Sequence, residues 1–225
     1  MMKTFLRLFA FSLLAVSFLS RAGDAISEAE QRVFLDDHLK NIKQSSVLTY
    51  RLHQVGKPEE TYDDSAKVSI KAATSKTSKQ VDVDYLSGTN KVALPDISDA
   101  QGNPVILYFL EKDVRDMHRI VGGQEAYFRK RIRLALADTA EVHPVTVTYN
   151  GHAVAGSEVR IFPYANDPLR QRFGDYYKKS YIFTISDQVP GGVYQIRTQV
   201  DNPKIIAPDA PPLMQTTLTL SSVGK

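Results

Sequence analysis

The sequence predicts an α+β domain in which a long, curled antiparallel sheet forms a half-barrel and two or three helices pack on its concave face. Many segments alternate apolar and polar residues, which is typical of strands with one buried face. Residues 110–137 instead repeat their apolar positions with the spacing of two consecutive helices. Because a sheet of about eight or nine strands tends to curl, the helices are expected on its concave side.

The chain begins with the pattern of a secretory signal peptide. Lys3 and Arg7 precede an apolar run of about 12 residues, whereas a membrane span needs about 20. We expect residues 1–22, or alternatively 1–25, to be removed on export to the periplasm. Residues 26–225 are predicted to form one soluble domain without a transmembrane span.

Charge and cysteine content narrow the classes of function. The chain has 28 Lys and Arg against 25 Asp and Glu. Three of the basic residues and no acid lie in residues 1–22, so the mature chain has 25 of each and a net charge of zero. A nucleic-acid partner is therefore not expected. The absence of cysteine excludes a lipid-anchored bacterial lipoprotein, disulfides and a thiol nucleophile.

The first elements are a helix and three strands. A helix is expected over residues 27–45, because Ser27 and Glu30 form a capping-box signature. Alternating segments then predict strands over 47–52, 67–71 and 80–86, with turns at 56–58 and 87–90. In the third strand, Asp82 and Asp84 share the face opposite the apolar residues, so we expect them to be solvated.

The middle of the chain predicts a helical hairpin. Its first apolar run, residues 105–110, fits a strand or a helix equally well, and we expect a short strand that passes into a helix at Leu110. Gly122 and Gly123 should end this helix, because glycine accepts the left-handed cap conformation. A second helix is expected over residues 124–137, with apolar residues on one side and cations on the other.

Strands dominate the remainder. Asn150-Gly151 is a strong hairpin signal between two alternating segments. Asp167 and Pro168 suit the start of a short helical turn that ends at Phe173. A proline-rich linker is expected over 203–212. The predicted strands are 145–149, 152–155, 158–164, 177–186, 193–200 and 214–221.

Three stretches resemble a group of uncharacterised exported proteins of Gram-negative bacteria. They are residues 102–117, 127–135 and 189–197, and the resemblance covers roughly residues 45–221. It implies no catalytic residues. In the order of its elements the chain is also similar to the periplasmic lipoprotein-carrier family of LolA and its relatives. That resemblance implies a half-barrel whose helices form a lid over an apolar cavity.

Apolar side chains near one strand and one helix are candidates for lining a ligand groove. Aromatic residues concentrate around the strand at 177–186, and the first helix of the hairpin adds an apolar stripe. These side chains would either line a groove inside the half-barrel or pack as ordinary core. The candidate ligand-binding residues are Tyr177, Tyr181, Phe183, Val114 and Met117.

Four cations within five residues of the second helix are candidates for contact with an anionic headgroup or a protein partner. They are Arg129, Lys130, Arg131 and Arg133. Long side chains with charged tips suit a site at a membrane surface. The alternative is a solvated helix face neutralised by Glu111, Asp113 and Asp116.

These features lead to three functional hypotheses. The first is a non-enzymatic periplasmic protein that binds or carries lipid, an acyl chain or a lipidated protein. The second is an envelope protein–protein interaction module without a ligand cavity. The third is an envelope hydrolase, which predicts His143 or His152 beside a carboxylate in a cleft. No catalytic or phosphate-binding motif and no metal-ligand spacing appears in the sequence, so we expect no catalytic residues, metal or cofactor.

Overall fold

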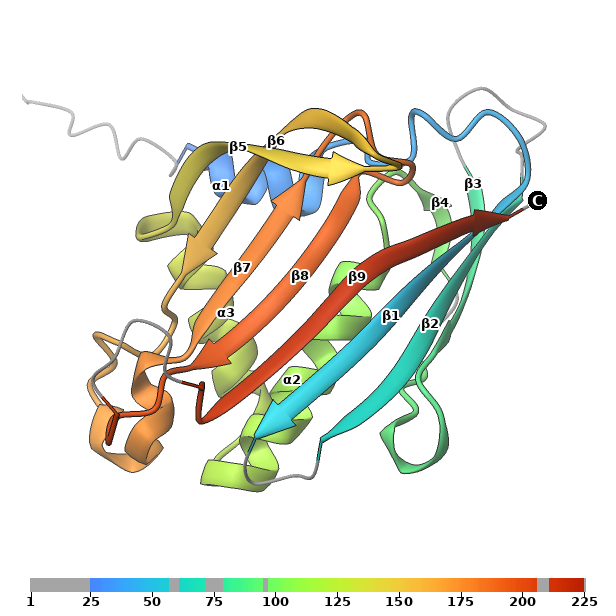
Figure 1. Ribbon diagram of the computed structural model, residues 1–225. Coiled ribbons are helices and arrows are strands. Elements are labelled where there is room, and N and C mark those ends of the chain that lie inside the picture. Colours follow the sequence, from blue (N-terminus) through green and yellow to red (C-terminus); the bar gives the residue numbers. More distant parts are fainter. Residues whose placement is uncertain (1–24, 57–60, 72–78, 95–96, 206–210, 225) are drawn as a thin grey trace, which may run out of the picture.

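The structure is a computed structural model that describes residues 25–56, 61–71, 79–94, 97–205 and 211–224 (Figure 1). The predicted signal peptide lies outside the described residues. The helical segments are α1 (Glu28–Glu30), η1 (Gln31–Leu35), η2 (Gly88–Asn90), α2 (Val105–Val121), α3 (Glu125–Asp138) and η3 (Arg170–Lys178). The strands are β1 (Ser46–Gly56), β2 (Tyr62–Lys71), β3 (Lys79–Tyr85), β4 (Ile97–Ala100), β5 (Glu141–Tyr149), β6 (His152–Ile161), β7 (Ser180–Ile185), β8 (Val193–Val200) and β9 (Met214–Gly224).

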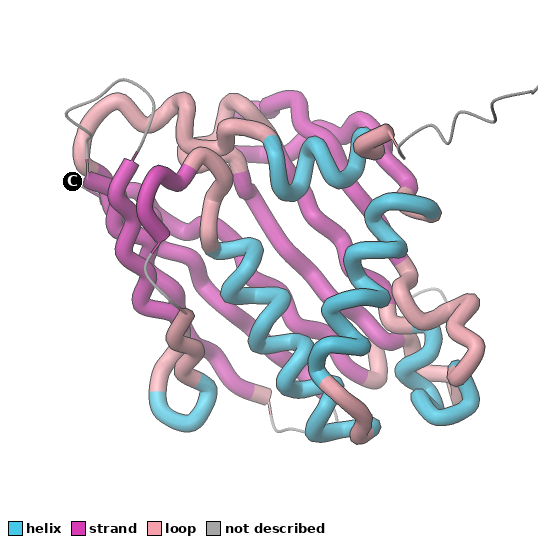
Figure 2. The backbone as a smooth tube through the Cα atoms, turned by 180° about the vertical axis from the view of Figure 1, so that it is seen from behind, coloured by secondary structure: helices cyan, strands magenta, loops and turns pink. Residues whose placement is uncertain are grey.

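The described strands form one nine-stranded antiparallel sheet. Its order is β4-β3-β2-β1-β9-β8-β7-β6-β5, so the last strand of the chain lies between β1 and β8 near the middle. The sheet curls without closing, and α2 and α3 lie side by side across its concave face (Figure 2). The predicted fold class, a curled antiparallel sheet with helices on its concave side, is confirmed.

Alternation along the strands gives the sheet its buried face. Leu48, Tyr50 and Leu52 of β1 are at most 1% exposed, and each is followed by a more exposed residue. In β9, Leu218 and Leu220 are buried on the same side, as the predicted period of two requires. These side chains meet the apolar faces of α2 and α3 in one continuous core.

Helix α2 begins five residues earlier than expected. The short strand predicted for residues 105–110 is wrong, because this run forms the first turns of the helix. The Asn103 side chain accepts a hydrogen bond from the Val105 N–H at 3.2 Å, which satisfies one of the free donors at the helix start. The helix ends as predicted at Gly122, where φ is +71° and the N–H bonds to the His118 carbonyl.

The first helix is shorter than expected. The capping box is present, with reciprocal bonds of 3.0 and 3.1 Å between Ser27 and Glu30. Helical structure nevertheless ends at Leu35 and not at residue 45, because Asp36 is extended. The chain then turns so that the buried His38 ring reaches the Arg32 carbonyl at 2.7 Å.

The remaining differences concern strand boundaries. The two strands predicted over 152–155 and 158–164 form one strand, β6, which ends at Ile161, and β4 was not predicted. Helical structure continues beyond Phe173 to Lys178 in η3, so the strand predicted over 177–186 begins only at Ser180. The hairpin turn has the expected positive φ values, +49° at Asn150 and +78° at Gly151. Residues 57–60 and 206–210, which hold parts of the predicted turn and linker, lie outside the described residues.

Candidate functional site

A groove of about 520 Å³ runs between α2 and α3. Residues 107–114 of α2 and 126–133 of α3 face each other across it, because on each helix the lining residues recur at intervals of three or four. Segments from elsewhere in the chain supply two more lining side chains. The lining residues are Phe34, Leu94, Leu107, Leu110, Glu111, Val114, Ala126, Arg129, Lys130, Ile132 and Arg133.

The floor of the groove is apolar and well packed. Leu110, Val114 and Ile132 are 8%, 1% and 3% exposed, so they belong to the core and close the groove from below. Leu107 stands at one side and is 46% exposed, whereas the other apolar residues of α2 as far as Met117 are buried. Exposed apolar area beside a groove marks a surface where a ligand gains from being removed from water.

Cations stand along the α3 side of the groove. Arg129, Lys130 and Arg133 all line it and are exposed. No salt bridge joins Lys130 or Arg133 to any described residue. The groove therefore combines an apolar floor with two unneutralised positive charges at its rim.

Arg129 differs from Lys130 and Arg133 because it forms ion pairs with two glutamates. Its guanidinium donates to Glu111 at 3.0 and 2.8 Å and to Glu125 at 2.6 Å. The hydrogen bond to Glu111 raises the pKa of Arg129 above its ordinary value. The same bond lowers the pKa of Glu111, so both groups stay charged near neutral pH.

The structure separates Arg131 from the other three cations. Its Nε lies 2.8 Å from an Asp167 oxygen, and the Asp167 side chain is fully buried. Tyr127 also donates to Asp167, at 2.7 and 2.8 Å. Arg131 therefore has an internal partner on another side of α3.

Four of the five candidate ligand residues lie away from the groove. Val114 forms part of its floor, whereas Tyr181, Phe183 and Met117 are 0% exposed in the core between the sheet and the helices. Tyr177 lies half-buried in η3, where the Lys178 ammonium is 5.4 Å from its ring centroid. The described residues at the centre of the concave face thus pack against one another.

A charged network lies under α2 and was missed from the sequence. Lys179, which is 0% exposed, forms an ion pair with Asp113 of α2. The Tyr181 hydroxyl donates to the other Asp113 oxygen at 2.5 Å and lies 2.9 Å from the Tyr164 hydroxyl. Burial, and then the Asp113 charge, raise the pKa of Tyr181 well above its ordinary value. This network connects α2 to the sheet.

The three acids expected to neutralise the basic cluster therefore have different partners. Glu111 pairs with Arg129 and, at 3.4 Å, with Arg115. Asp113 faces inward to Lys179. Asp116 pairs with Lys112 at 2.7 Å, and burial raises the pKa of Asp116 although Lys112 opposes this shift.

The residues named by the hydrolase hypothesis are exposed. His143 lies 3.7 Å from Glu141 on the edge strand β5, and their side chains are 61% and 57% exposed. His152 is also exposed, at the hairpin turn. Neither histidine lines the α2–α3 groove, and the His143–Glu141 pair is open to solvent.

Two further properties concern the described residues as a whole. Within them, His, Cys, Asp and Glu side chains nowhere gather in a group of three that could hold a metal ion. None of the helices in the described part of the chain has the length and apolarity needed to cross a membrane.

Known proteins resemble this chain only in outline. No family model and no curated protein sequence matches it. Among solved structures, it is similar to the lipoprotein LppX of Mycobacterium tuberculosis, with 9% identity, a TM-score of 0.36 and coverage of 88% of this chain and 93% of that one.

Two other solved structures resemble the chain at a lower level. A LolA superfamily protein from Nitrosomonas europaea has 12% identity, a TM-score of 0.23 and coverage of 89% and 94%. A domain described as an outer membrane lipoprotein-sorting protein, from Vibrio parahaemolyticus, has 10% identity, a TM-score of 0.21 and coverage of 87% and 88%. At these identities and TM-scores the three structures indicate no function for this chain.

Proposed function

We propose that this protein is a non-enzymatic periplasmic protein that binds an anionic amphiphile, such as a lipid or acyl chain with a negative headgroup, in the α2–α3 groove. The observation that carries the proposal is the apolar floor beside the unpaired Lys130 and Arg133. Periplasmic location rests on the N-terminal sequence pattern alone.

The groove suits part of an acyl chain. Val114 follows Leu107 by seven positions in α2, with Leu110 between them, so the three span roughly 10 Å at about 1.5 Å per residue. Each methylene removed from water contributes about 0.8 kcal/mol. Affinity is therefore expected to rise about fourfold for each added methylene until the groove is filled.

The cations give a preference for one kind of headgroup. Lys130 and Arg133 can each donate charge-assisted hydrogen bonds to a phosphate or carboxylate at the end of the chain. Arg129 contributes less, because Glu111 and Glu125 already accept its donors. A neutral headgroup of the same size would leave the two free cations unpaired.

Titration calorimetry with single-chain amphiphiles below their micelle concentration tests the proposal. We expect dodecyl phosphate to bind more tightly than the neutral dodecyl maltoside or the cationic dodecyltrimethylammonium. The double variant Lys130→Gln/Arg133→Gln should lower the affinity for dodecyl phosphate about tenfold or more. The matched control is Arg51→Gln/Lys67→Gln, which removes two exposed cations from β1 and β2.

Several outcomes would contradict the proposal. One is equal affinity for the phosphate and the maltoside. Another is an equal loss of affinity in the control variant. Binding of none of the three amphiphiles would overturn the proposal as a whole.

A second candidate function is the envelope interaction module. The observation in its favour is the packed concave face, where Tyr181, Phe183 and Met117 are fully buried. The same groove would then receive an apolar segment of another protein. A photo-reactive phenylalanine in place of Leu107, activated in living cells, distinguishes the two functions. Crosslinks of lipid mass support the carrier, and crosslinks to a polypeptide support the module.

A further inference from the structure

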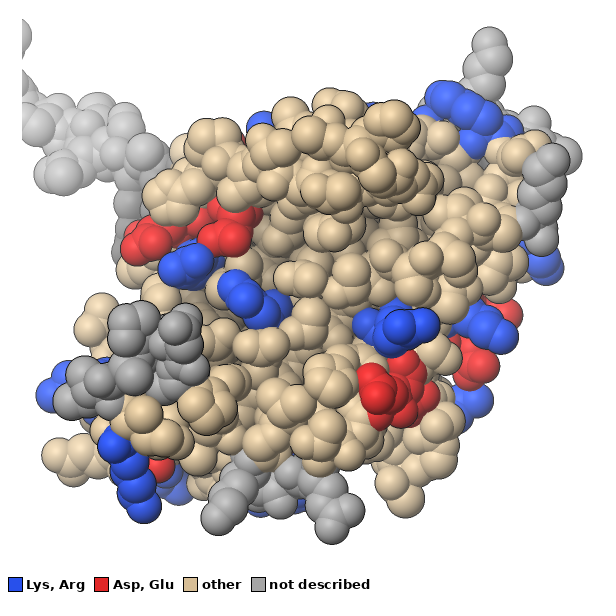
Figure 3. Space-filling model, in the orientation of Figure 1, with Lys and Arg blue, Asp and Glu red and all other residues tan. Residues whose placement is uncertain are grey.

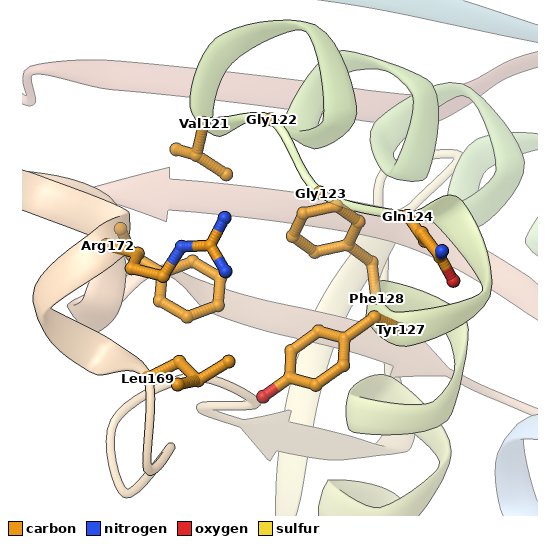
Figure 4. Close-up of a pocket in the computed structure, with 9 residues that line it drawn as sticks. Val121, Gly122, Gly123, Gln124, Tyr127, Phe128, Leu169 and Arg172 are labelled. Carbon is orange, nitrogen blue, oxygen red and sulfur yellow. The ribbon is translucent and has the colours of Figure 1, made fainter.

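A second pocket, of about 280 Å³, lies between the α2–α3 turn and η3 (Figure 4). It shares no lining residue with the α2–α3 groove, so the proposed function makes no use of it. Its lining is largely apolar and rich in aromatic rings. The lining residues are Val121, Gly122, Gly123, Gln124, Tyr127, Phe128, Leu169, Arg172 and Phe173.

The pocket is held in shape by groups beneath it. Phe128 and Phe173 are 2% and 4% exposed, and their rings meet nearly perpendicularly with centroids 6.1 Å apart. Tyr127 is fixed by its hydrogen bonds to Asp167, which also accepts the Leu169 N–H at 2.7 Å. These contacts fix the side chains that form the pocket, and a site whose side chains are already fixed costs little reorganisation on binding.

Arg172 supplies the one charged side chain of the lining. Its guanidinium points toward the pocket in the direction of Gly123 (Figure 4). The side chain is exposed, and none of the described residues forms a salt bridge with it. An unpaired guanidinium beside an apolar pocket favours a ligand with an anionic end.

We propose that this pocket binds an aromatic carboxylate. The aromatic ring would lie in the pocket against Tyr127, Phe128 and Phe173, which line it and offer aromatic contacts. The carboxylate would remain at the mouth and accept hydrogen bonds from Arg172. Two sources offer this chemistry, a free aromatic acid and the C-terminal aromatic residue of a polypeptide.

Titration calorimetry on the folded protein tests the pocket with matched pairs of probes. The first pair is 3-phenylpropionate and 3-phenyl-1-propanol, which share the ring and differ in charge. The second pair is the tripeptide Ala-Ala-Phe with a free and with an amidated C-terminus. Arg172→Gln removes the guanidinium, and Arg170→Gln is its control, because Arg170 is an exposed cation of η3 that does not line the pocket.

We expect 3-phenylpropionate to bind more tightly than the alcohol, and Arg172→Gln to weaken only the acid, by about tenfold. Arg170→Gln should change neither by more than about twofold. A second variant, Leu169→Trp, places a large ring at the mouth from a position that is 44% exposed, and should abolish binding of both probes. If the tripeptide acid binds more tightly than 3-phenylpropionate, the source is a polypeptide C-terminus; otherwise it is a free acid.

Two results would overturn this inference. One is an affinity for 3-phenylpropionate that neither Arg172→Gln nor Leu169→Trp changes. The other is no binding of either acid at millimolar concentration. Neither result affects the groove, because the dodecyl phosphate experiment uses different residues.

Discussion

The two sides of helix α2 differ in whether their charges are paired and their apolar side chains are buried. On the side toward the sheet, Asp113 is ion-paired with the buried Lys179, and Met117 is fully buried. On the side toward the groove, Leu107 is 46% exposed and faces Lys130 and Arg133, which have no acidic partner among the described residues. On one side of α2 the charges are paired and the apolar residues are buried, whereas on the other side an apolar residue is exposed beside unpaired cations.

This difference separates structural from functional roles. A buried charge must be paired, because an isolated one costs several kcal/mol. An exposed cation costs almost nothing to leave unpaired, so Lys130 and Arg133 remain available for another molecule.

Figure 3 shows the face of the sheet that lies opposite the helices, where Lys, Arg, Asp and Glu are scattered and most of the visible described surface belongs to other residues.

The largest expected loss of stability comes from a substitution on the side of α2 that faces the sheet. Asp113→Ala leaves Lys179 buried without its carboxylate and removes the acceptor of the Tyr181 hydroxyl. We expect a loss of about 3–5 kcal/mol in the free energy of unfolding, measured by urea denaturation. The double variant Asp113→Leu/Lys179→Met removes both charges and should recover most of this loss. A loss below about 1 kcal/mol in the single variant would show that the ion pair does not hold α2 to the sheet.

The next largest loss of stability is expected at Arg131, and not at Arg133 of the same helix. Arg131→Gln leaves the buried Asp167 carboxylate with fewer donors, and we expect a loss of about 1–3 kcal/mol in urea denaturation. Arg133→Gln removes a cation with no such partner and should change the stability by less than about 0.5 kcal/mol. Equal losses would contradict the division of the basic cluster between an internal and an external role.

Acid should weaken the contact that holds the segment after η1. Burial lowers the pKa of His38 below its ordinary value of 6.5, and its ring accepts the Asn103 N–H while bonding to the Arg32 carbonyl. Below about pH 6.5 the unfolded chain therefore binds more protons at this residue than the folded protein. His38 favours folding above that pH, and this contribution is lost as the pH falls.

Thermal unfolding at pH 7.5 and pH 5.5 measures the effect of His38. We expect His38→Gln to lower the Tm at pH 7.5 and to reduce the further decrease on acidification. His53→Gln is the control, because the His53 side chain is 49% exposed. An unchanged dependence on pH in His38→Gln would exclude His38 as its source.

The smallest effect on stability is expected at the outer side of α2. Leu107→Ser should alter the free energy of unfolding by less than about 0.5 kcal/mol, because the side chain is largely exposed. The same variant should weaken dodecyl phosphate in calorimetry, since it removes apolar surface from the groove. A stability loss comparable with that of Asp113→Ala would mean that Leu107 is part of the core.

Local patterns predicted the sheet well. The alternation in β9, the Asn150-Gly151 turn and the Ser27–Glu30 capping box each depend on residues close in sequence, and each is present in the structure. The strand expected at residues 105–110 was wrong because a helix buried on several sides has no polar positions to reveal its period. Read as a helix, the same run places Leu107 three residues before Leu110 and seven before Val114, which is the stripe of the groove.

The candidate site was less predictable because it depends on distant segments. Lys130 and Arg133 could be named from the sequence, but their division from Arg131 depends on where Asp167 lies in the fold. The Asp113–Lys179 pair joins residues 66 positions apart, and no spacing rule connects them. Tyr181 and Phe183 alternate in the same way whether they line a cavity or fill a core.

The open sheet has a consequence for the behaviour of the protein at high concentration. A half-barrel leaves two edges, and unpaired strand edges invite pairing with other chains, which leads to aggregation. One edge strand here, β4, has four residues. The other, β5, contains Pro144 opposite Ser157, and proline cannot donate a ladder hydrogen bond. Both features make the edges poorer templates for strand addition.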